Sequence, residues 1–283
     1  SSLRQDARVI GLVGVSHGVS HFYHLILAGL FPWLKAAFVL SYAELGFLMT
    51  VFFVVSGVGQ ALSGFLVDKV GARRVLFSGH ALLGIGALVL AAAPNYSVLL
   101  LGSLIAGCGN AVFHPAGYTL LNQNVSKERL PHAFSVHGIS GNIGWAAAPL
   151  FLAGVATLSS WRVALLAASA IPALMLLTLV LNRKVLSTAA PVQTSAQAAG
   201  GSFDFLRLPA VWMCFGFFFL TSVALGGIQA FSSTSLTALY AISLPTAATA
   251  YTTYMLSSAA GMVAGGFLAA RARSYDRTIA VSF

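Results

Sequence analysis

Long apolar runs, each about as long as a helix needs to cross a bilayer, follow one another along most of this 283-residue chain. A helix spans the hydrocarbon core with about 20 residues. We predict eight such spans: 9–34, 44–66, 75–94, 98–121, 132–156, 163–181, 209–231 and 246–270. A ninth predicted span begins at residues 278–283. The runs lack the alternation of barrel strands, and only helices and closed barrels pair all their backbone groups in lipid. The sequence therefore predicts an all-α polytopic membrane protein.

The charge content excludes a water-soluble globule of this size. A soluble domain carries about 25% charged residues, whereas this chain carries 7%. The net charge of +9 does not indicate a nucleic-acid partner, because Lys and Arg stand in short clusters between the apolar runs and are not interleaved with aromatic residues. The bilayer is the surrounding that this composition predicts.

The basic residues also predict how the chain is oriented in the membrane. Every second connection between spans holds thirteen of the fifteen basic residues: Arg4, Arg8, Lys69, Arg73, Arg74, Lys127, Arg129, Arg183, Lys184, Arg207, Arg271, Arg273 and Arg277. The other connections hold only Lys35 and Arg162. Because loops rich in Lys and Arg stay in the cytoplasm, we expect a multi-pass protein of the inner or plasma membrane with a cytoplasmic N-terminus.

A polar segment divides the spans into two groups. Residues 185–208 are rich in Ala, Ser, Gly, Gln and Pro, which is typical of a flexible linker. We predict a six-helix bundle over 1–184, a cytoplasmic linker over 185–208 and a partial second bundle over 209–283. Aligning Gly64 with Gly266 superimposes GFLVDKVGARR on GFLAARARSYDR, so the halves resemble parallel repeats. The alternative is a chance likeness between two helices rich in Gly and Ala.

The loop after the second predicted span carries a spaced motif. Its residues fit the pattern G-x-x-x-D-[R/K]-x-G-x-[R/K]-[R/K]: Gly64, Asp68, Lys69, Gly71, Arg73 and Arg74. Gly64 allows a close helix approach, and Gly71 can adopt the positive φ of a tight turn. Asp68 can pair with a neighbouring arginine or a helix N-terminus. Positive-inside topology alone accounts for most of the arginine content but not for Asp68.

This loop resembles the signature loop of the major facilitator superfamily. The segments SHGVSHFYH, GNAVFHPAG and FSVHGISGNIGW resemble the fosmidomycin-resistance-like branch of that family. The resemblance implies two six-helix halves in the complete protein, with four further spans beyond these, and it implies rocking of the halves around a central site. It also implies that the loop locks one conformational state, and the branch implies proton-driven drug efflux. One departure is that no carboxylate lies deep in any predicted span, so the family's usual acidic proton carrier is not among them.

Polar residues inside the apolar runs are the candidate site. Ionisable groups are costly in a membrane and usually face a cavity or a partner. The candidates for a substrate or proton pathway are His17, His21, His24, His114, His137, Asn110 and Asn142. The first three stand at i, i+4 and i+7, which places them on one stripe of a helix. Pro115 interrupts the backbone hydrogen bonds beside His114.

The histidines admit three interpretations. They are polar packing residues, they bind substrate or carry protons near the ordinary imidazole pKa of about 6.5, or they bind Zn²⁺ or Ni²⁺. Because no Asp, Glu or Cys joins them on the helix, we expect no metal site and no cofactor. Our hypothesis is that His17, His21 and His114 form a titratable cluster, which suits an anionic solute when protonated.

We therefore predict a monomeric secondary active transporter that exports a small molecule or drug by alternating access, with protons as the coupling ion. The alternative is an uptake symporter for a metabolite or organic anion. The chain has no GxxxxGK[S/T] loop, so ATP is not the expected energy source. We expect no enzymatic activity, since no nucleophile is placed beside a base. A sensor or structural bundle is the remaining class, and the Gly64–Arg74 loop argues against it.

Overall fold

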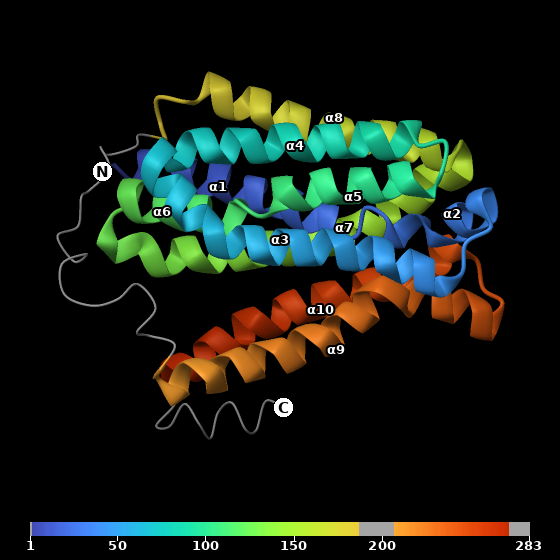
Figure 1. Ribbon diagram of the computed structural model, residues 1–283. Coiled ribbons are helices and arrows are strands. Elements are labelled where there is room, and N and C mark those ends of the chain that lie inside the picture. Colours follow the sequence, from blue (N-terminus) through green and yellow to red (C-terminus); the bar gives the residue numbers. More distant parts are fainter. Residues whose placement is uncertain (1, 187–206, 272–283) are drawn as a thin grey trace.

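The computed structural model describes residues 2–186 and 207–271, and within those ranges its regular elements are all helices. They are α1 (Leu3–His24), η1 (Ala28–Leu30), α2 (Phe31–Phe38), α3 (Tyr42–Val70), α4 (Ala72–Ala92), α5 (Tyr96–Asn110), α6 (Phe113–Asn124), η2 (Lys127–Arg129), α7 (Leu130–Leu158), α8 (Trp161–Leu181), α9 (Pro209–Tyr240) and α10 (Leu244–Arg271). Figure 1 shows α1 to α8 as one bundle, with α9 and α10 paired along one flank. The predicted all-α fold is confirmed.

The first predicted span is not one continuous helix. Where the sequence predicts a span over 9–34, α1 already begins at Leu3 and ends at His24, and the segment Ala28–Phe38 is bent from it by 47°. Pro32 lies in the first turn of α2, where its missing N–H costs nothing. A proline at that place favours a new helix start over continuation of the old helix.

Side chains from neighbouring helices bind carbonyl groups that prolines leave free. Pro115 cannot donate to the carbonyl of Ala111, and α5 ends just before that residue. The Ser63 hydroxyl of α3 donates to this carbonyl at 3.2 Å. The predicted interruption beside His114 is thus confirmed. The freed carbonyl has a hydrogen-bond donor inside the bundle, where an unpaired carbonyl would be costly.

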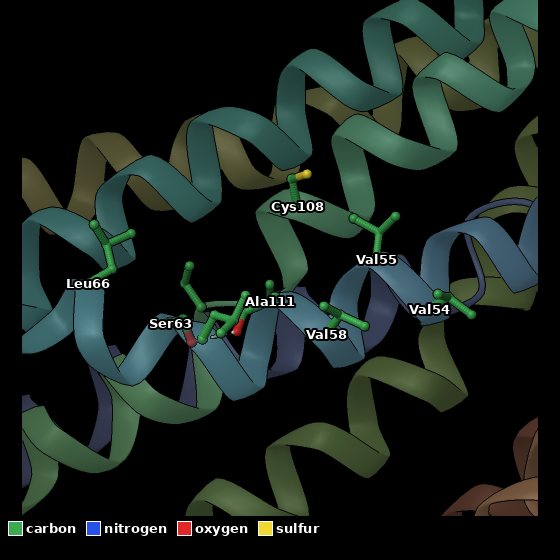
Figure 2. Close-up of a pocket in the computed structure, with 10 residues that line it drawn as sticks. Val54, Val55, Val58, Ser63, Leu66, Cys108 and Ala111 are labelled. Carbon is green, nitrogen blue, oxygen red and sulfur yellow. Dashed lines mark hydrogen bonds between the residues drawn. The ribbon is translucent and has the colours of Figure 1, made fainter. Parts of the chain in front are cut away.

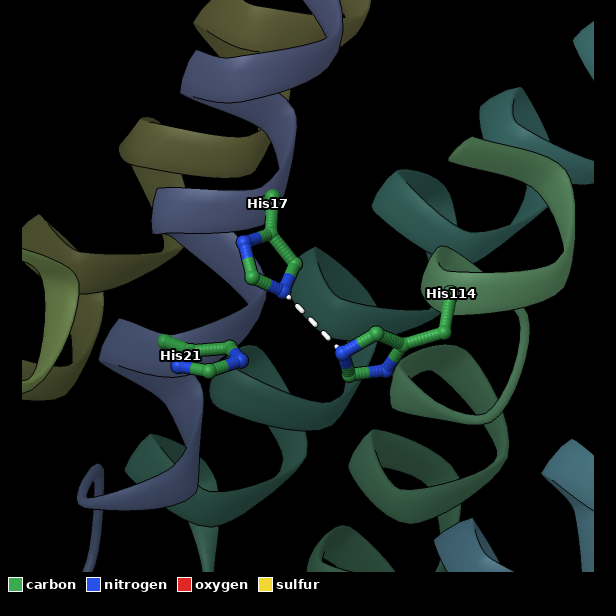
Figure 3. A group of neighbouring side chains, drawn as sticks. All are labelled: His17, His21 and His114. Atoms are coloured by element: carbon green, nitrogen blue, oxygen red, sulfur yellow. Dashed lines mark hydrogen bonds between the residues drawn. The ribbon is translucent and has the colours of Figure 1, made fainter. Parts of the chain in front are cut away.

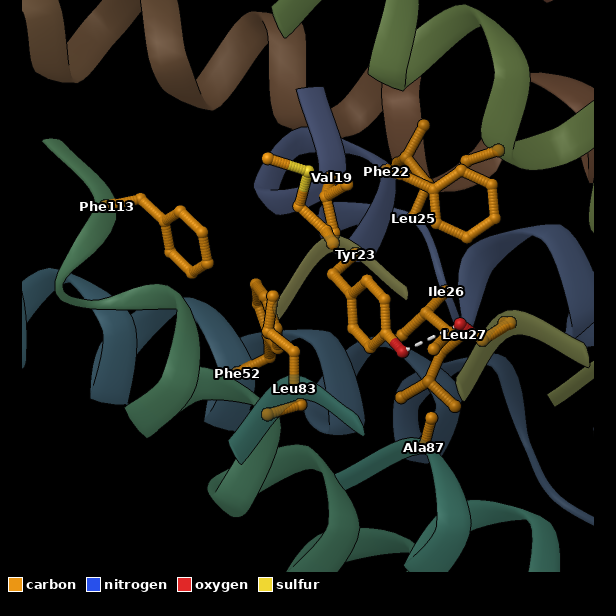
Figure 4. Packing of buried hydrophobic residues seen from close by; sticks show 14 of the residues in the cluster. Val19, Phe22, Tyr23, Leu25, Ile26, Leu27, Phe52, Leu83, Ala87 and Phe113 are labelled. Carbon is orange, nitrogen blue, oxygen red and sulfur yellow. Dashed lines mark hydrogen bonds between the residues drawn. The ribbon is translucent and has the colours of Figure 1, made fainter. Parts of the chain in front are cut away.

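The same arrangement recurs at Pro172, which lies inside α8. Its ring leaves the carbonyl of Ala168 without a backbone donor, and the Tyr23 hydroxyl donates to that oxygen at 3.1 Å. Tyr23 is fully buried at the centre of the apolar core, where Figure 4 shows it among Phe52, Leu83 and other core side chains. This bond therefore joins α1 to α8 through the core.

Local signals set several of the helix boundaries. Ser41 and Glu44 form a reciprocal capping box at the start of α3, and the side chains of Asn95 and Ser160 cap α5 and α8. Gly71 separates α3 from α4 with a φ of 95°, which confirms the predicted positive-φ turn.

Among the residues that the structure describes, six helical segments have the length and hydropathy needed to cross a membrane: Tyr42–Val70, Ala72–Ala92, Tyr96–Asn124, Lys127–Leu158, Trp161–Leu181 and Pro209–Tyr240. The bent pair of α1 and the Ala28–Phe38 segment makes a seventh. The predicted span over 246–270 is present as α10, but α10 is not among these segments.

Helix α10 packs along α7, whereas α9 contacts the bundle mainly near η1. The Thr252 hydroxyl of α10 donates to the carbonyl of Ala146 in α7 at 2.7 Å, and the rings of Phe31 and Phe231 lie 5.7 Å apart. The outer face of α9 is apolar and exposed, for example at Phe215 (59%) and Phe218 (65%), as expected for a lipid-facing surface.

Residues 187–206 and 272–283 lie outside the described residues, and with them most of the predicted linker, the second basic loop of the repeat and the start of the ninth span. The two-bundle division remains a prediction.

Candidate transport site

Helices far apart in the sequence bring five histidines together in the bundle. His17, His21 and His24 come from α1, His114 from α6 and His137 from α7. The ring of His17 stacks on that of His137 with centroids 3.6 Å apart, and it lies 4.1 Å from His21 and 4.9 Å from His114. We name these five residues the histidine cluster; Figure 3 shows three of them.

His17 is held by α7 and faces α6. Its Nδ1 donates to the backbone carbonyl of His137 at 2.6 Å, and its Nε2 lies 3.2 Å from Nε2 of His114. The other ring nitrogen of His114, Nδ1, lies 2.9 Å from Oε1 of Gln60 on α3. A chain of hydrogen-bonding groups therefore runs from α7 through α1 and α6 to α3.

The positions of the hydrogens decide which charge this row of hydrogen-bonding groups can hold. The His137 carbonyl and the Gln60 oxygen both accept, so each facing Nδ1 carries a hydrogen. If both rings were neutral, two bare Nε2 atoms would face each other at 3.2 Å. One positive charge between His17 and His114 removes that conflict. Rotating the Gln60 amide by 180° instead offers its NH₂ to His114, which fits a neutral pair. Gln60 thus serves either state of the pair.

A second polar network surrounds His24. The indole N–H of Trp145 donates to its Nδ1 at 3.1 Å, and its Nε2 lies 3.0 Å from Nδ2 of Asn110. Asn110 also contacts the hydroxyls of Ser20 at 2.6 Å and Ser56 at 2.7 Å. Because indole N–H only donates, the hydrogen of a neutral His24 lies on Nε2. For that hydrogen to be accepted, the Asn110 amide would have to be rotated by 180°, so that its oxygen and not its nitrogen faces Nε2 of His24.

Two members of the cluster hold buried nitrogen atoms without hydrogen-bond partners among the described residues. In His21 and in His137, both ring nitrogens lack such a partner. His21 is 8% exposed and His137 3% exposed. Such atoms are costly to bury, and in a membrane they commonly mark a site that receives a ligand or an ion.

Small residues of α7 make room for the rings. A Cβ at Gly141 would come within 2.6 Å of Nδ1 of His21 and 2.9 Å of Cε1 of His17. At Gly144 it would overlap the backbone carbonyl oxygen of Gly18, so α1 and α7 pack closely at this level. The histidine cluster therefore depends on glycine at defined positions of α7.

The structure brings most of the predicted site residues together. The five histidines form the cluster and Asn110 binds His24, while Asn142 is buried on α7. Sequence analysis missed Gln60, Ser56 and Trp145. Gln60 is a single amide within the apolar run 44–66, and the rule that polar residues inside the membrane are functional candidates would have found it.

The spaced motif from Gly64 to Arg74, expected to lock one conformational state, makes only some of its expected contacts with other described residues. Arg73 donates to the carbonyls of Arg183 at 2.9 Å and Leu186 at 3.2 Å, which joins the start of α4 to the segment that follows α8. Asp68 is exposed and makes no ion pair within residues 2–186 and 207–271. A Cβ at Gly64 would meet nothing within 4 Å. The expected close helix approach at Gly64 is therefore not made by any described helix.

An ion pair lies instead at the start of α1. Asp6 is fully buried, and Arg129 of η2 donates to its Oδ2 at 2.6 Å, as does the Ser126 hydroxyl at 2.7 Å. This contact joins α1 to the connection between α6 and α7. Asp6 precedes the predicted first span, so it does not alter the finding that the predicted spans lack a deep carboxylate.

A pocket of about 550 Å³ lies outside the histidine cluster, between α3 and the end of α5 (Figure 2). Its lining is apolar apart from Ser63 and Cys108, and the Ser63 hydroxyl already donates to a backbone carbonyl. Val54 and Val58, which line it, are more than half exposed. The pocket therefore offers packing surface and little means to bind a polar solute.

Comparisons with known proteins agree with this architecture. The chain is 29% identical over 145 residues to the uncharacterized MFS-type transporter YfnC of Bacillus subtilis, covering 51% of this chain and 35% of YfnC. It is 26% identical over 150 residues to the fosmidomycin resistance protein of Escherichia coli, covering 53% of this chain and 37% of that protein. These matches span about a third of each relative's length.

Solved structures show the same fold. An inward-facing, unoccupied bacterial homologue of the human lysosomal transporter Spinster superposes with a TM-score of 0.75 and 18% identity. The match covers 96% of this chain and 64% of the homologue. The model of the Major Facilitator Superfamily matches residues 13–283, nearly the whole sequence. The chain therefore belongs to the Major Facilitator Superfamily of membrane transporters.

Proposed function

We propose that this chain forms the larger part of a secondary active transporter that exports a small molecule across the inner membrane in exchange for protons. The complete transporter would be a monomer with two six-helix halves, a cytoplasmic N-terminus and alternating access to a central site. The observation that carries the proposal is the chain of contacts from the His137 carbonyl through His17 and His114 to Gln60.

This chain of contacts suits proton coupling for a physical reason. A carrier must bind its coupling ion in one state of the site and release it in another. The His17–His114 pair fits one positive charge with Gln60 in one orientation and none in the other. His17 lies on α1, His114 on α6 and Gln60 on α3, so movement between these helices would change the geometry that holds the proton.

The histidine cluster also supports a solute class. Protonated imidazoles inside a bundle attract anions, and few acidic groups compete for them, because the chain has six Asp and Glu residues in all. The fosmidomycin resistance protein is among the relatives, which favours export of an antibacterial compound. We propose an anionic drug, such as a phosphonate, as the exported solute.

Inside-out vesicles that contain the full-length transporter test the direction and the coupling. With the lumen made acidic, export in the cell appears as solute accumulation in the vesicles, and dissipating the pH gradient abolishes it. Accumulation that requires the opposite gradient would indicate uptake by symport, the alternative function. Accumulation that is indifferent to any pH gradient would contradict proton coupling.

A further inference from the structure

We propose that His17, His21 and His114 form a binding site for a divalent first-row transition-metal ion such as Zn²⁺ or Ni²⁺. One ring nitrogen from each of these residues lies within 4.8 Å of the other two. The proposal goes beyond the proposed function, because metal binding does not require that protons drive transport.

The spacing of the facing nitrogens fits a metal. In a tetrahedral zinc site with Zn–N bonds of about 2.0–2.1 Å, two ligand nitrogens lie about 3.3 Å apart. The Nε2 atoms of His17 and His114 are 3.2 Å apart, so an ion can bridge them with little movement of either ring. The pair needs one positive charge between these atoms while Gln60 presents its oxygen, and a metal ion supplies that charge.

The outer hydrogen bonds are those of metal-bound histidines. A ligating imidazole usually donates its second N–H to a carbonyl or carboxylate, which fixes the ring and its tautomer. Nδ1 of His17 faces the backbone carbonyl of His137 at 2.6 Å, and Nδ1 of His114 faces the Gln60 oxygen at 2.9 Å. Both rings are thereby oriented with Nε2 toward the same point (Figure 3).

The third ligand is an independent observation. His21 is 8% exposed, and neither of its ring nitrogens has a hydrogen-bond partner among the described residues. No hydrogen bond therefore resists the ring rotation that would bring a nitrogen to the metal. Gly141 of α7 lies directly beside both His17 and His21, and the Trp145 ring of the same helix lies 4.3 Å from the His21 ring.

The donor set indicates the class of ion. Imidazole nitrogens suit Zn²⁺, Ni²⁺, Co²⁺ and Cu²⁺, whereas Mg²⁺ and Ca²⁺ require oxygen ligands. Three protein ligands leave a fourth tetrahedral position for water or for an anionic group of a solute. The sequence groups His17, His21 and His114 as a titratable cluster, but it gives no reason to expect a metal among them. A metal ion and the coupling proton would occupy the same position, so each would exclude the other.

The test is Co²⁺ titration of the purified full-length transporter in detergent, followed by visible absorption, with Zn²⁺ competition and equilibrium dialysis of Ni²⁺. We expect the strong visible bands of four-coordinate Co²⁺, and displacement of Co²⁺ by Zn²⁺. Replacement H21A or H114Q should raise the dissociation constant at least tenfold. The matched controls are H132A, an exposed histidine outside the cluster, and H80A, a buried histidine that instead contacts Ser16.

The results of these measurements test the metal site separately from the proposed function. Weak octahedral Co²⁺ binding, or equal loss of binding in H132A and H21A, would overturn the proposal. Size-exclusion profiles and thermal unfolding verify that H114Q, whose side chain is only half-buried, remains folded. Flux in vesicles with and without a chelator is measured separately. Metal binding without pH-driven flux refutes only the proposed function, and pH-driven flux without metal binding refutes only this inference.

Discussion

The Nε2 atoms of His17 and His114 lie 3.2 Å apart although 97 residues separate them in the sequence. Two imidazole nitrogens at this distance need a positive charge or a single hydrogen between them, and the Gln60 amide can adapt to either arrangement. At this contact between α1 and α6, the distance between the two nitrogens restricts which protonation states the pair can adopt.

Replacing His17, His114 or the neighbouring His21 should uncouple transport. We expect H17A, H21A and H114A each to lower solute accumulation driven by a pH gradient by roughly tenfold or more. The removed rings supply either the proton site or its surroundings. The measurement is initial flux in inside-out vesicles, with H132A as the control. Unchanged proton-coupled flux in all three variants would refute the role of the cluster.

The close approach of α1 and α7 should make Gly144 intolerant of a side chain. A methyl group there meets the backbone carbonyl of Gly18, and such overpacking costs about 1–3 kcal/mol. We expect G144A to lower the thermal unfolding temperature. The matched control is G154A on the same helix, where a Cβ meets nothing within 4 Å. G154A should be neutral or stabilising by up to about 1 kcal/mol, the helix-propensity difference.

The bond from Tyr23 to the Ala168 carbonyl should matter only because Pro172 leaves that carbonyl free. We expect Y23F to destabilise the protein by about 0.6 kcal/mol, and at most about 1.7 kcal/mol, the range of interhelical hydrogen bonds in membranes. In a P172A background the carbonyl regains a backbone donor, so Y23F should cost less. A double-mutant cycle from thermal unfolding measures this coupling. Additive effects would contradict the pairing.

The ion pair at the start of α1 should respond unequally to its two partners. R129A removes a charge partner from a fully buried carboxylate. We expect the free energy of unfolding to fall by about 1–3 kcal/mol, which is less than for a fully buried pair because Arg129 is 36% exposed. D6N should cost less, because an amide oxygen still accepts from Ser126. Chemical unfolding in mild detergent compares the two. A larger loss in D6N than in R129A would contradict this account.

The predicted orientation can be checked by cysteine labelling after C108S and C214S remove the native thiols. We expect K69C and S274C to react with a membrane-impermeant maleimide only after the membrane is permeabilised, because both basic loops should be cytoplasmic. The control S159C, at the opposite end of α7 from His132, should react in intact cells. If K69C and S274C fall on opposite sides, the parallel-repeat interpretation fails.

The sequence by itself determined the class of protein and the identity of most of the polar residues involved. Apolar runs of span length with a charge content of 7% leave only a helical membrane protein. The Gly64–Arg74 motif was enough to indicate the family, and the position of Gly71 in a turn followed from glycine's access to positive φ. These are local or compositional properties, so no knowledge of packing was needed.

The tertiary structure decided which polar groups meet. The stripe His17–His21–His24 is visible on one helix, but its partners His114, His137 and Gln60 come from three other helices. Their approach depends on close contacts such as Gly144 against Gly18. The 47° bend after His24 also escaped the hydropathy pattern, because the residues on both sides of it are apolar. Hydropathy records how well each residue tolerates lipid, whereas a binding site depends on how helices distant in sequence pack together.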